Sequence, residues 1–191
     1  MTSRPLIQVI VASTRPGRAG EPTAHWIAQQ ARAHGGFDVE VVDLAEIDLP
    51  VYAEPEHPRS RDYALDSTRR FSVLIERADG FVFVFPEYNH SYNAALKNAL
   101  DHLYWEWGDK PAVLAGYGGV AAGARAAVAL QPVLLALRMR IAGLLPIPFI
   151  DQYLHDQDGT RVFRPTPAVE QGAKAALDAF AAALPPAAAH S

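Results

Sequence analysis

A short basic segment between residues 13 and 20 carries the groups that proteins use to bind an anion. Ser13 supplies a hydroxyl, and Arg15 and Arg18 supply guanidinium groups. Gly20 ends the segment directly before a predicted helix. Backbone N–H groups at a helix start favour a bound anion, and guanidinium groups can add charge-assisted hydrogen bonds. The pattern favours a phosphate site over its alternative, an ordinary solvated turn between a strand and a helix.

The same segment lacks the sequence features of two familiar nucleotide sites. It has no Lys-Ser/Thr ending, which marks the P-loop of nucleotide hydrolases. It also has no G-x-G-x-x-G pattern, which marks a dinucleotide-binding fold. ATP hydrolysis and a conventional NAD fold are therefore both disfavoured, and the remaining candidate is the phosphate of a mononucleotide.

Two further segments, each after an apolar run, carry recognisable strings of residues. Residues 86–101 read P-E-Y-N-x-S, then four residues, then L-K-N-A-x-D. Residues 118–125 contain paired glycines followed by G-x-R. Together with Ser13-x-Arg15 these strings resemble, in order and place, the NADPH-dependent FMN reductase family, whose members include quinone, azo, nitro and chromate reductases. The resemblance spans most of the chain.

The resemblance implies an FMN site, with NADPH or NADH as co-substrate. In that family the flavin ring rests against the loop that matches residues 86–91, largely through backbone groups, and the third loop lies beside it. The predicted cofactor-binding residues are Ser13, Arg15, Arg18, Gly20, Pro86, Glu87, Tyr88, Asn89, Ser91, Tyr117, Gly118 and Gly119. Glu87 is expected to shape the turn rather than to titrate. Hydride transfer through a cofactor demands no side-chain acid or base, so no catalytic residue is assigned.

Several side chains near these loops have a second, structural explanation. Tyr88 and Tyr92 fit direct ring contact and half-buried or interface aromatics equally well. Lys97, Asn98 and Asp101 lie on a predicted helix, where pairing or capping is favoured over contact with the cofactor. These alternatives stay open at the level of the sequence.

The aromatic segment 104–107, Tyr-Trp-Glu-Trp, follows that helix and is denser in aromatic residues than any other part of the chain. Aromatic residues near a surface often mark contact sites. The resemblance implies homodimers, sometimes paired into tetramers, in which the partner subunit helps to cover the flavin. We therefore hypothesise that this segment contributes to the dimer surface or to the substrate pocket.

The composition of the chain disfavours several classes of partner and of chemistry. The net charge of −4 comes from 17 basic and 21 acidic residues without long blocks of either sign, so neither nucleic acid nor an anionic membrane is an expected partner. The chain has no cysteine, so any redox chemistry must come from a cofactor. Its seven histidines match no H-E-x-x-H pattern, and no metal site is predicted. No stretch approaches the roughly 20 apolar residues of a membrane span, and a cytoplasmic location is expected.

Strands and helices must position these loops. Along the chain, apolar runs typical of strands alternate with segments that have helical periodicity. Strands are expected at residues 6–12, 37–44, 81–85, 112–115 and 144–150. Helices are expected from about residue 21 to 34, around 71–78, over 94–103, from about 121 to 141 and over 169–184. Such alternation is typical of a parallel sheet that is covered by helices on both faces.

Two of the expected strands have the composition of sheet edges. Residues 37–44 include three acidic side chains, and residues 144–150 include two prolines. Strand order 2-1-3-4-5 places both at edges and predicts an α/β, three-layer flavodoxin-like fold with a five-stranded parallel sheet. A ligand is then expected between the loops after strands one and three. We expect one domain over residues 1–184 and a disordered tail over 185–191.

The function implied is that of an FMN-dependent NAD(P)H oxidoreductase. Hydride would pass from a nicotinamide through bound FMN to a small electron acceptor such as a quinone, azo or nitro compound, or to free flavin as the second substrate. Two alternatives from other classes are a flavodoxin-type FMN electron carrier and a flavin-free interaction module on the same fold. A net charge of only −4 favours a reductase over a carrier, because such carriers tend to be strongly acidic.

Overall fold

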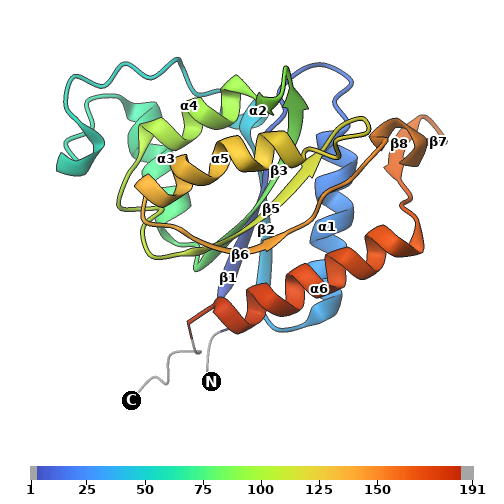
Figure 1. Ribbon diagram of the computed structural model, residues 1–191. Helices are drawn as coiled ribbons and strands as arrows, with labels where there is room; N and C mark the ends of the chain where they lie inside the picture. Colours follow the sequence, from blue (N-terminus) through green and yellow to red (C-terminus); the bar gives the residue numbers. More distant parts are fainter. Residues whose placement is uncertain (1–3, 186–191) are drawn as a thin grey trace.

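The computed structural model describes residues 4–185 and contains a parallel sheet between two layers of helices (Figure 1). The parallel strands are β1 (Leu6–Val11), β2 (Asp38–Asp43), β3 (Gly80–Tyr88), β5 (Pro111–Tyr117) and β6 (Arg140–Leu144). Their order is β2-β1-β3-β5-β6, and the short β4 (Ser91–Tyr92) pairs antiparallel with the end of β3. With β4 set aside, this is the predicted doubly wound order, with β2 and β6 at the edges.

The helices fall into two groups, one on each face of the sheet. They are α1 (Gly20–His34), α2 (Leu44–Ile47), α3 (Asp66–Glu76), α4 (Ala94–His102), α5 (Ala124–Ala136) and α6 (Pro167–Ala183), with short 3-10 turns at Pro58–Ser60 and Ile150–Tyr153. α1 and α6 cover one face, while α3, α4 and α5 cover the other (Figure 1). No helix within residues 4–185 is long and apolar enough to cross a membrane.

The central strand β3 shows why the sheet is buried on both faces. Phe81, Phe83 and Phe85 belong to the core shared with α3, α4 and α5. Val82 and Val84, which point the opposite way, belong to the core shared with α1 and α6. All five side chains are buried. A continuous apolar run is what a strand covered by helices on both sides requires.

The predicted boundary between the fifth helix and the last strand is wrong. The helix was expected to reach residue 141 and the strand to cover 144–150, but α5 ends at Ala136 and β6 begins at Arg140. Met139 N–H donates to Leu134 O and Arg138 N–H to Leu135 O, both at 2.9 Å, which is a Schellman end. Arg138, not glycine, holds the left-handed position at φ 63°, so the usual stop signal was missing.

The second predicted loop is an ordered hairpin. β3 continues three residues beyond the expected end at residue 85, and Glu87 and Tyr88 pair with Tyr92 and Ser91. The two turn residues, Asn89 at φ 49° and residue 90 at φ 67°, are both left-handed, as a two-residue type I′ hairpin turn requires. The segment is therefore more rigid than a loop of its composition would suggest.

A second hairpin after β6 was not predicted. β7 (Leu154–Gln157) and β8 (Thr160–Phe163) pair antiparallel on their own, apart from the main sheet. Asp158 at φ 52° and Gly159 at φ 78° form the turn between them. An Asp-Gly pair between short alternating runs is a strong hairpin signal that the sequence did offer. Residues 186–191, most of the expected tail, lie outside the described residues.

Candidate functional site

The three predicted loops meet at the carboxyl edge of the sheet. β1 lies beside β3, and β3 lies beside β5, so the loops that follow them leave the sheet as neighbours. The chain winds in opposite directions on either side of the β1–β3 pair, which is where doubly wound folds bind ligands. Side chains join the loops directly: Arg15 Nε donates to the Tyr88 hydroxyl at 3.0 Å, and that hydroxyl lies 3.4 Å from Ser13 Oγ.

The first loop presents a row of backbone donors. The first backbone hydrogen bond of α1 runs from the Thr23 N–H to Ala19 O, at 3.3 Å. Within residues 4–185, the N–H groups of residues 13–15 and 17–21 have no backbone hydrogen-bond acceptor. The loop leads into the first turn of α1, where the helix dipole adds a partial positive charge. This donor set fits a phosphate group, which offers acceptor oxygens and negative charge.

Tyr117 adds a hydroxyl beneath this loop. Its side chain is 4% exposed, and its oxygen has no hydrogen-bond partner of acceptable geometry among the described residues. The oxygen lies against the first turn of α1, since a Cβ built on Gly20 would stand 2.7 Å from it. Burial raises the pKa of Tyr117, so the phenol keeps its proton and can donate it. A buried donor without a partner is costly, and a phosphate oxygen would satisfy it.

The two predicted arginines of the first loop differ in their partners. Arg18 forms ion pairs with the carboxylate of Asp43, whose side chain is 10% exposed, and with Glu21, the latter at 3.3 Å. Burial raises the pKa of Asp43, against the opposing charge of Arg18. Arg15 is exposed and bonds only to the neutral Tyr88 hydroxyl in the described structure. Arg15 therefore has the guanidinium that remains available to an anion, whereas Arg18 helps to hold the loop against β2.

Glu87 anchors the β3–β4 hairpin to the start of α5. Its carboxylate forms an ion pair with Arg125 and accepts the Arg125 backbone N–H at 3.2 Å. Its side chain is only 6% exposed. Burial alone would raise the pKa of Glu87, but the hydrogen bonds and charge of Arg125 outweigh it and lower the pKa. This agrees with the expectation that Glu87 shapes the turn.

The third loop is held by the segment that follows β6. Phe149 N–H donates to Gly119 O and Ile150 N–H to Gly118 O, both at 3.1 Å. Ala122 at φ 55° and Gly123 at φ 76° are left-handed, which delays α5 to residue 124 instead of the expected 121. A Cβ on Gly123 would stand 2.4 Å from the Gly116 carbonyl carbon, so this close approach requires glycine.

Asn93 is a site residue that the sequence reasoning missed. It is 5% exposed and precedes α4, and its Nδ2 donates to Ala12 O at 2.7 Å. That bond ties the second loop to the end of β1, directly before the first loop. Its Oδ1 is buried without a partner among residues 4–185. Its place two residues after the P-E-Y-N-x-S string was the available signal.

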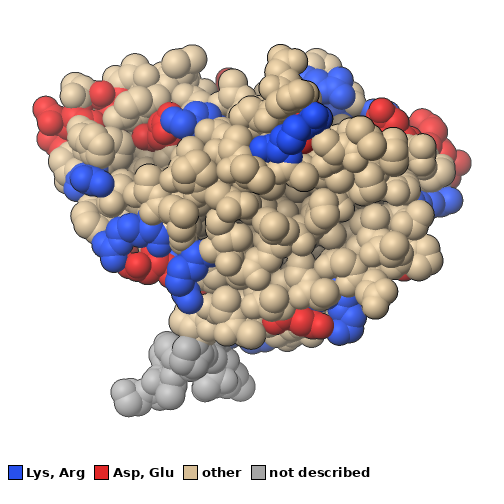
Figure 2. Space-filling view, viewed as in Figure 1, with Lys and Arg blue, Asp and Glu red and all other residues tan. Residues whose placement is uncertain are grey.

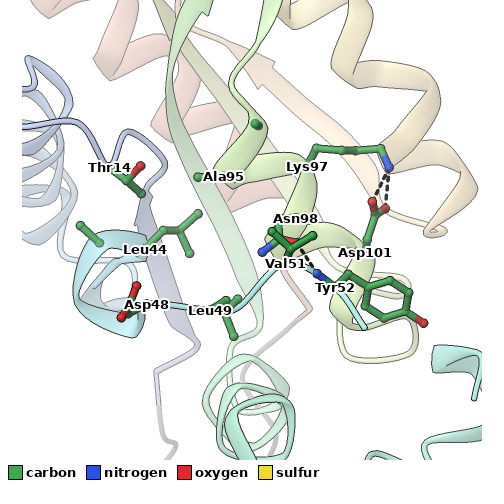
Figure 3. Close-up of a pocket in the computed structure, with 12 residues that line it drawn as sticks. Thr14, Leu44, Asp48, Leu49, Val51, Tyr52, Ala95, Lys97, Asn98 and Asp101 are labelled. Atoms are coloured by element: carbon green, nitrogen blue, oxygen red, sulfur yellow. Dashed lines mark hydrogen bonds and ion pairs between the residues drawn. The ribbon is translucent and has the colours of Figure 1, made fainter. Parts of the chain in front are cut away.

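A groove of about 740 Å³ lies beside the first loop, between residues 44–52 and α4 (Figure 3). Thr14 contributes from the first loop. Lys97 and Asp101 line the groove and pair with each other at 2.7 Å, and Asn98 Oδ1 accepts a backbone N–H of the 44–52 segment at 2.8 Å. These contacts agree with the structural explanation of the three α4 side chains. No cluster of three metal-ligating side chains occurs in the described part of the chain.

The aromatic segment divides into two parts. Trp107 is 1% exposed and packs edge-on against Phe81, with ring centroids 4.9 Å apart. The hypothesis that it lies on a contact surface is therefore wrong, because its ring completes the core under α3. Trp105 is 41% exposed, and its Nε1 donates to Arg59 O at 2.9 Å. Only the outer half of the segment is available for contacts.

Comparison with known proteins agrees with this geometry. The family model for NADPH-dependent FMN reductases matches residues 5–145. An NAD(P)H-dependent FMN reductase of Schizosaccharomyces pombe is 42% identical over 144 residues, which cover 74% of this chain and 72% of the relative. An NADPH azoreductase of Bacillus is 32% identical over 157 residues, which cover 80% of this chain and 81% of the relative.

A solved structure agrees over nearly the whole chain. The flavoenzyme NAD(P)H:acceptor oxidoreductase FerB from Paracoccus denitrificans superimposes with a TM-score of 0.71 at 25% identity, and the match covers 93% of this chain and 96% of FerB. The matched family region contains all three loops at the edge of the sheet. The chain belongs to the NADPH-dependent FMN reductase family.

Proposed function

We propose that this protein is an FMN-dependent NAD(P)H oxidoreductase that passes hydride from a nicotinamide to a small electron acceptor. The observation that carries the proposal is the buried, unpartnered hydroxyl of Tyr117 beneath a loop of free backbone donors. In a chain of this family, that arrangement fits the phosphate end of FMN. The relatives are named as reductases of FMN and of azo compounds, which supports an azo compound or free flavin as acceptor. We include quinones and nitro compounds in the proposal as small acceptors of the same kind.

Each loop has a distinct part in holding the cofactor. Ser13, Arg15, Gly20 and Tyr117 would hold the phosphate, and Arg18 would support them through Asp43. Residues 86–91 and the Gly118-Gly119 pair would hold the flavin ring. When bound, the flavin supplies the hydride chemistry. The protein supplies orientation, through a hairpin whose first strand is held by side-chain contacts of Glu87 and Tyr88.

The rigidity of the hairpin matters because hydride transfer requires two flat rings to meet face to face at short distance. Glu87 holds its first strand against α5, and Asn93 holds its far end against β1. Backbone groups between these two anchors have little freedom to move. They can therefore present fixed dipoles to a ring that gains negative charge, without reorganisation during the reaction.

Further parts of the proposal concern organisation of the protein. We propose that residues 1–184 form one FMN-binding domain, that the protein is cytoplasmic, and that it forms a homodimer or tetramer.

An uncharged surface supports self-association: Figure 2 shows few charged side chains over α5, β6 and α6. On α5, Val128 and Leu135 are 66% and 62% exposed. Sedimentation of the wild type and of Val128→Glu tests this, and a wild-type monomer would contradict it.

An anaerobic titration of the purified protein with NADPH and with NADH tests the activity. A yellow protein that is bleached by either nicotinamide and recoloured by a quinone supports the proposed reductase. A colourless protein that consumes NADPH only when flavin is added favours free flavin as second substrate. A yellow protein that no nicotinamide bleaches is a flavodoxin-type carrier, and a protein that binds no flavin is an interaction module.

A further inference from the structure

The β7–β8 hairpin lies outside the part of the chain that the family model matches, yet it touches the first loop. The match ends at residue 145, and the hairpin spans residues 154–163. Arg161 Nη1 donates to the backbone carbonyl of Gly17 at 2.8 Å, across 144 residues of sequence. The contact therefore joins an element beyond the matched region to the proposed phosphate site.

The hairpin packs against α1, the helix that directly follows the first loop. Phe163 is 5% exposed and packs edge-on against Trp26 of α1, with ring centroids 5.3 Å apart. Tyr153 also packs edge-on against Phe163, with ring centroids 5.8 Å apart. A two-stranded hairpin alone is marginally stable in water, so these contacts hold it in place. Arg161 thus extends from a fixed support toward the loop.

The residue that Arg161 contacts is a glycine whose surroundings leave its backbone free to change conformation. Gly17 is exposed, has a φ of 65°, and has no atom within 4 Å of a Cβ built on it. Glycine crosses between left-handed and right-handed backbone conformations at little cost. In a trans peptide the C=O and the following N–H point in opposite directions. A hydrogen bond that fixes Gly17 O therefore also fixes the N–H of residue 18.

In the described structure, the charge of the Arg161 guanidinium is not balanced by an ion pair with a carboxylate. Asp156 lies opposite it on β7, but the Asp156 carboxylate accepts the Gly159 N–H at 3.0 Å. Within residues 4–185 no carboxylate forms an ion pair with Arg161. A positive charge beside the loop favours a dianionic ligand over a neutral one.

We propose that Arg161 is a positioning residue for the phosphate-binding loop and that the β7–β8 hairpin is a brace for it. Arg161 holds the Gly17–Arg18 peptide in one orientation, so that the loop meets a phosphate monoester with its donors already arranged. Prearranged donors bind more tightly because less conformational freedom is lost on binding. The inference rests on the proposed FMN function, and it predicts an effect confined to flavins that carry a phosphate.

The test compares FMN with riboflavin, which has the same ring and no phosphate. Dissociation constants are measured by flavin fluorescence with apoprotein of the wild type, Arg161→Gln, Arg161→Lys and Arg164→Gln. Arg164 is the matched control, because it bonds to Gln157 at 2.8 Å and not to the loop. We expect Arg161→Gln to weaken FMN binding roughly three- to tenfold and riboflavin binding less than about twofold. Arg161→Lys retains a donor and restores most of the FMN affinity.

Backbone 15N NMR relaxation of the apoprotein supplies a readout that needs no flavin. In Arg161→Gln, the order parameters of residues 17–19 should fall, while residues 118–123 and the Arg164→Gln protein should match the wild type. Unchanged FMN affinity, or an equal loss for FMN and riboflavin, overturns the inference. A wild-type protein that binds neither flavin contradicts the proposed function instead, and the order parameters then still decide whether Arg161 holds the loop.

Discussion

The hydroxyl oxygen of Tyr117 and the backbone of Gly20 lie so close that a Cβ at position 20 would stand 2.7 Å from that oxygen. The same oxygen is buried and has no partner within residues 4–185. One contact thus joins the end of β5 to the first turn of α1. A side chain at position 20 would therefore collide with the hydroxyl of residue 117.

Gly20→Ala should lower both stability and FMN affinity, because the added methyl displaces the Tyr117 side chain. We expect a loss of about 1–3 kcal/mol in the free energy of unfolding, measured by urea denaturation of the apoprotein. Removing the hydroxyl relieves the clash, so Gly20→Ala combined with Tyr117→Phe should recover most of that loss. A double variant no more stable than Gly20→Ala alone would contradict this account.

Tyr117→Phe alone should separate stability from binding. The apoprotein should be as stable as the wild type or up to about 1 kcal/mol more stable, because a buried donor without a partner is removed. FMN affinity should fall about tenfold, whereas riboflavin affinity should stay unchanged. Tyr104→Phe, which removes a hydroxyl that accepts from Arg59 at 3.1 Å, is the matched control and should alter neither.

Arg15 and Arg18 should respond differently to replacement by alanine. Arg15→Ala should weaken FMN binding with little effect on stability, because Arg15 is exposed and bonds only to a hydroxyl in the described structure. Arg18→Ala should lower the free energy of unfolding by about 1–3 kcal/mol, because it leaves the Asp43 carboxylate, which is only 10% exposed, without its cation. Thermal unfolding and flavin titration of both variants, side by side, measure this difference. Equal stability of the two variants would be the contrary result.

Glu87 should make stability depend on acid pH. Its pKa in the folded protein is lowered below the ordinary value of 4.5, so it stabilises the fold above about pH 4.5. That contribution is lost as the pH falls through the lower, folded-state pKa. Glu87→Gln should therefore be less stable than the wild type at pH 7, and the difference should shrink in acid. Asp62→Asn, at an exposed carboxylate that forms no ion pair in the described part of the chain, is the control.

Trp107 and Trp105 should differ sharply in their effect on stability. Trp107→Ala should lower the free energy of unfolding by about 3–5 kcal/mol, because it empties a core position between Phe71, Phe81 and Phe83. Trp105→Ala should cost less than about 1 kcal/mol, because its ring is half exposed. Urea denaturation measures both. A small effect of Trp107→Ala would mean that the core repacks around the missing ring.

Much of this architecture could be predicted because local pattern and tertiary role agree. The Phe-Val alternation of β3 is apolar on both faces, and the charges of β2 suit an edge, so strand order followed from composition. The loop positions followed from the strand order. The motif strings placed Arg15 and Tyr88 in loops that meet, and their side chains do touch.

The predictions failed where the structure depends on backbone conformations or tertiary contacts that the local sequence does not indicate. Arg138 takes a left-handed position that glycine usually fills, so the end of α5 was not visible. Trp107 was grouped with Tyr104 and Trp105 because the segment is dense in aromatic residues, and only tertiary packing distinguishes them. The pairing of Arg18 with Asp43 depends on two segments 25 residues apart, and no periodicity reports it.

The distance in sequence between Gly17 and Arg161 has a consequence for how the protein is made. A ribosome completes β1, the first loop and α1 long before it reaches the residue that bonds to Gly17, 144 positions later. A growing chain therefore has the loop sequence early but lacks its support until residue 161 has been added. Tight capture of the nucleotide should accordingly follow the emergence and folding of the β7–β8 hairpin, not that of the loop itself.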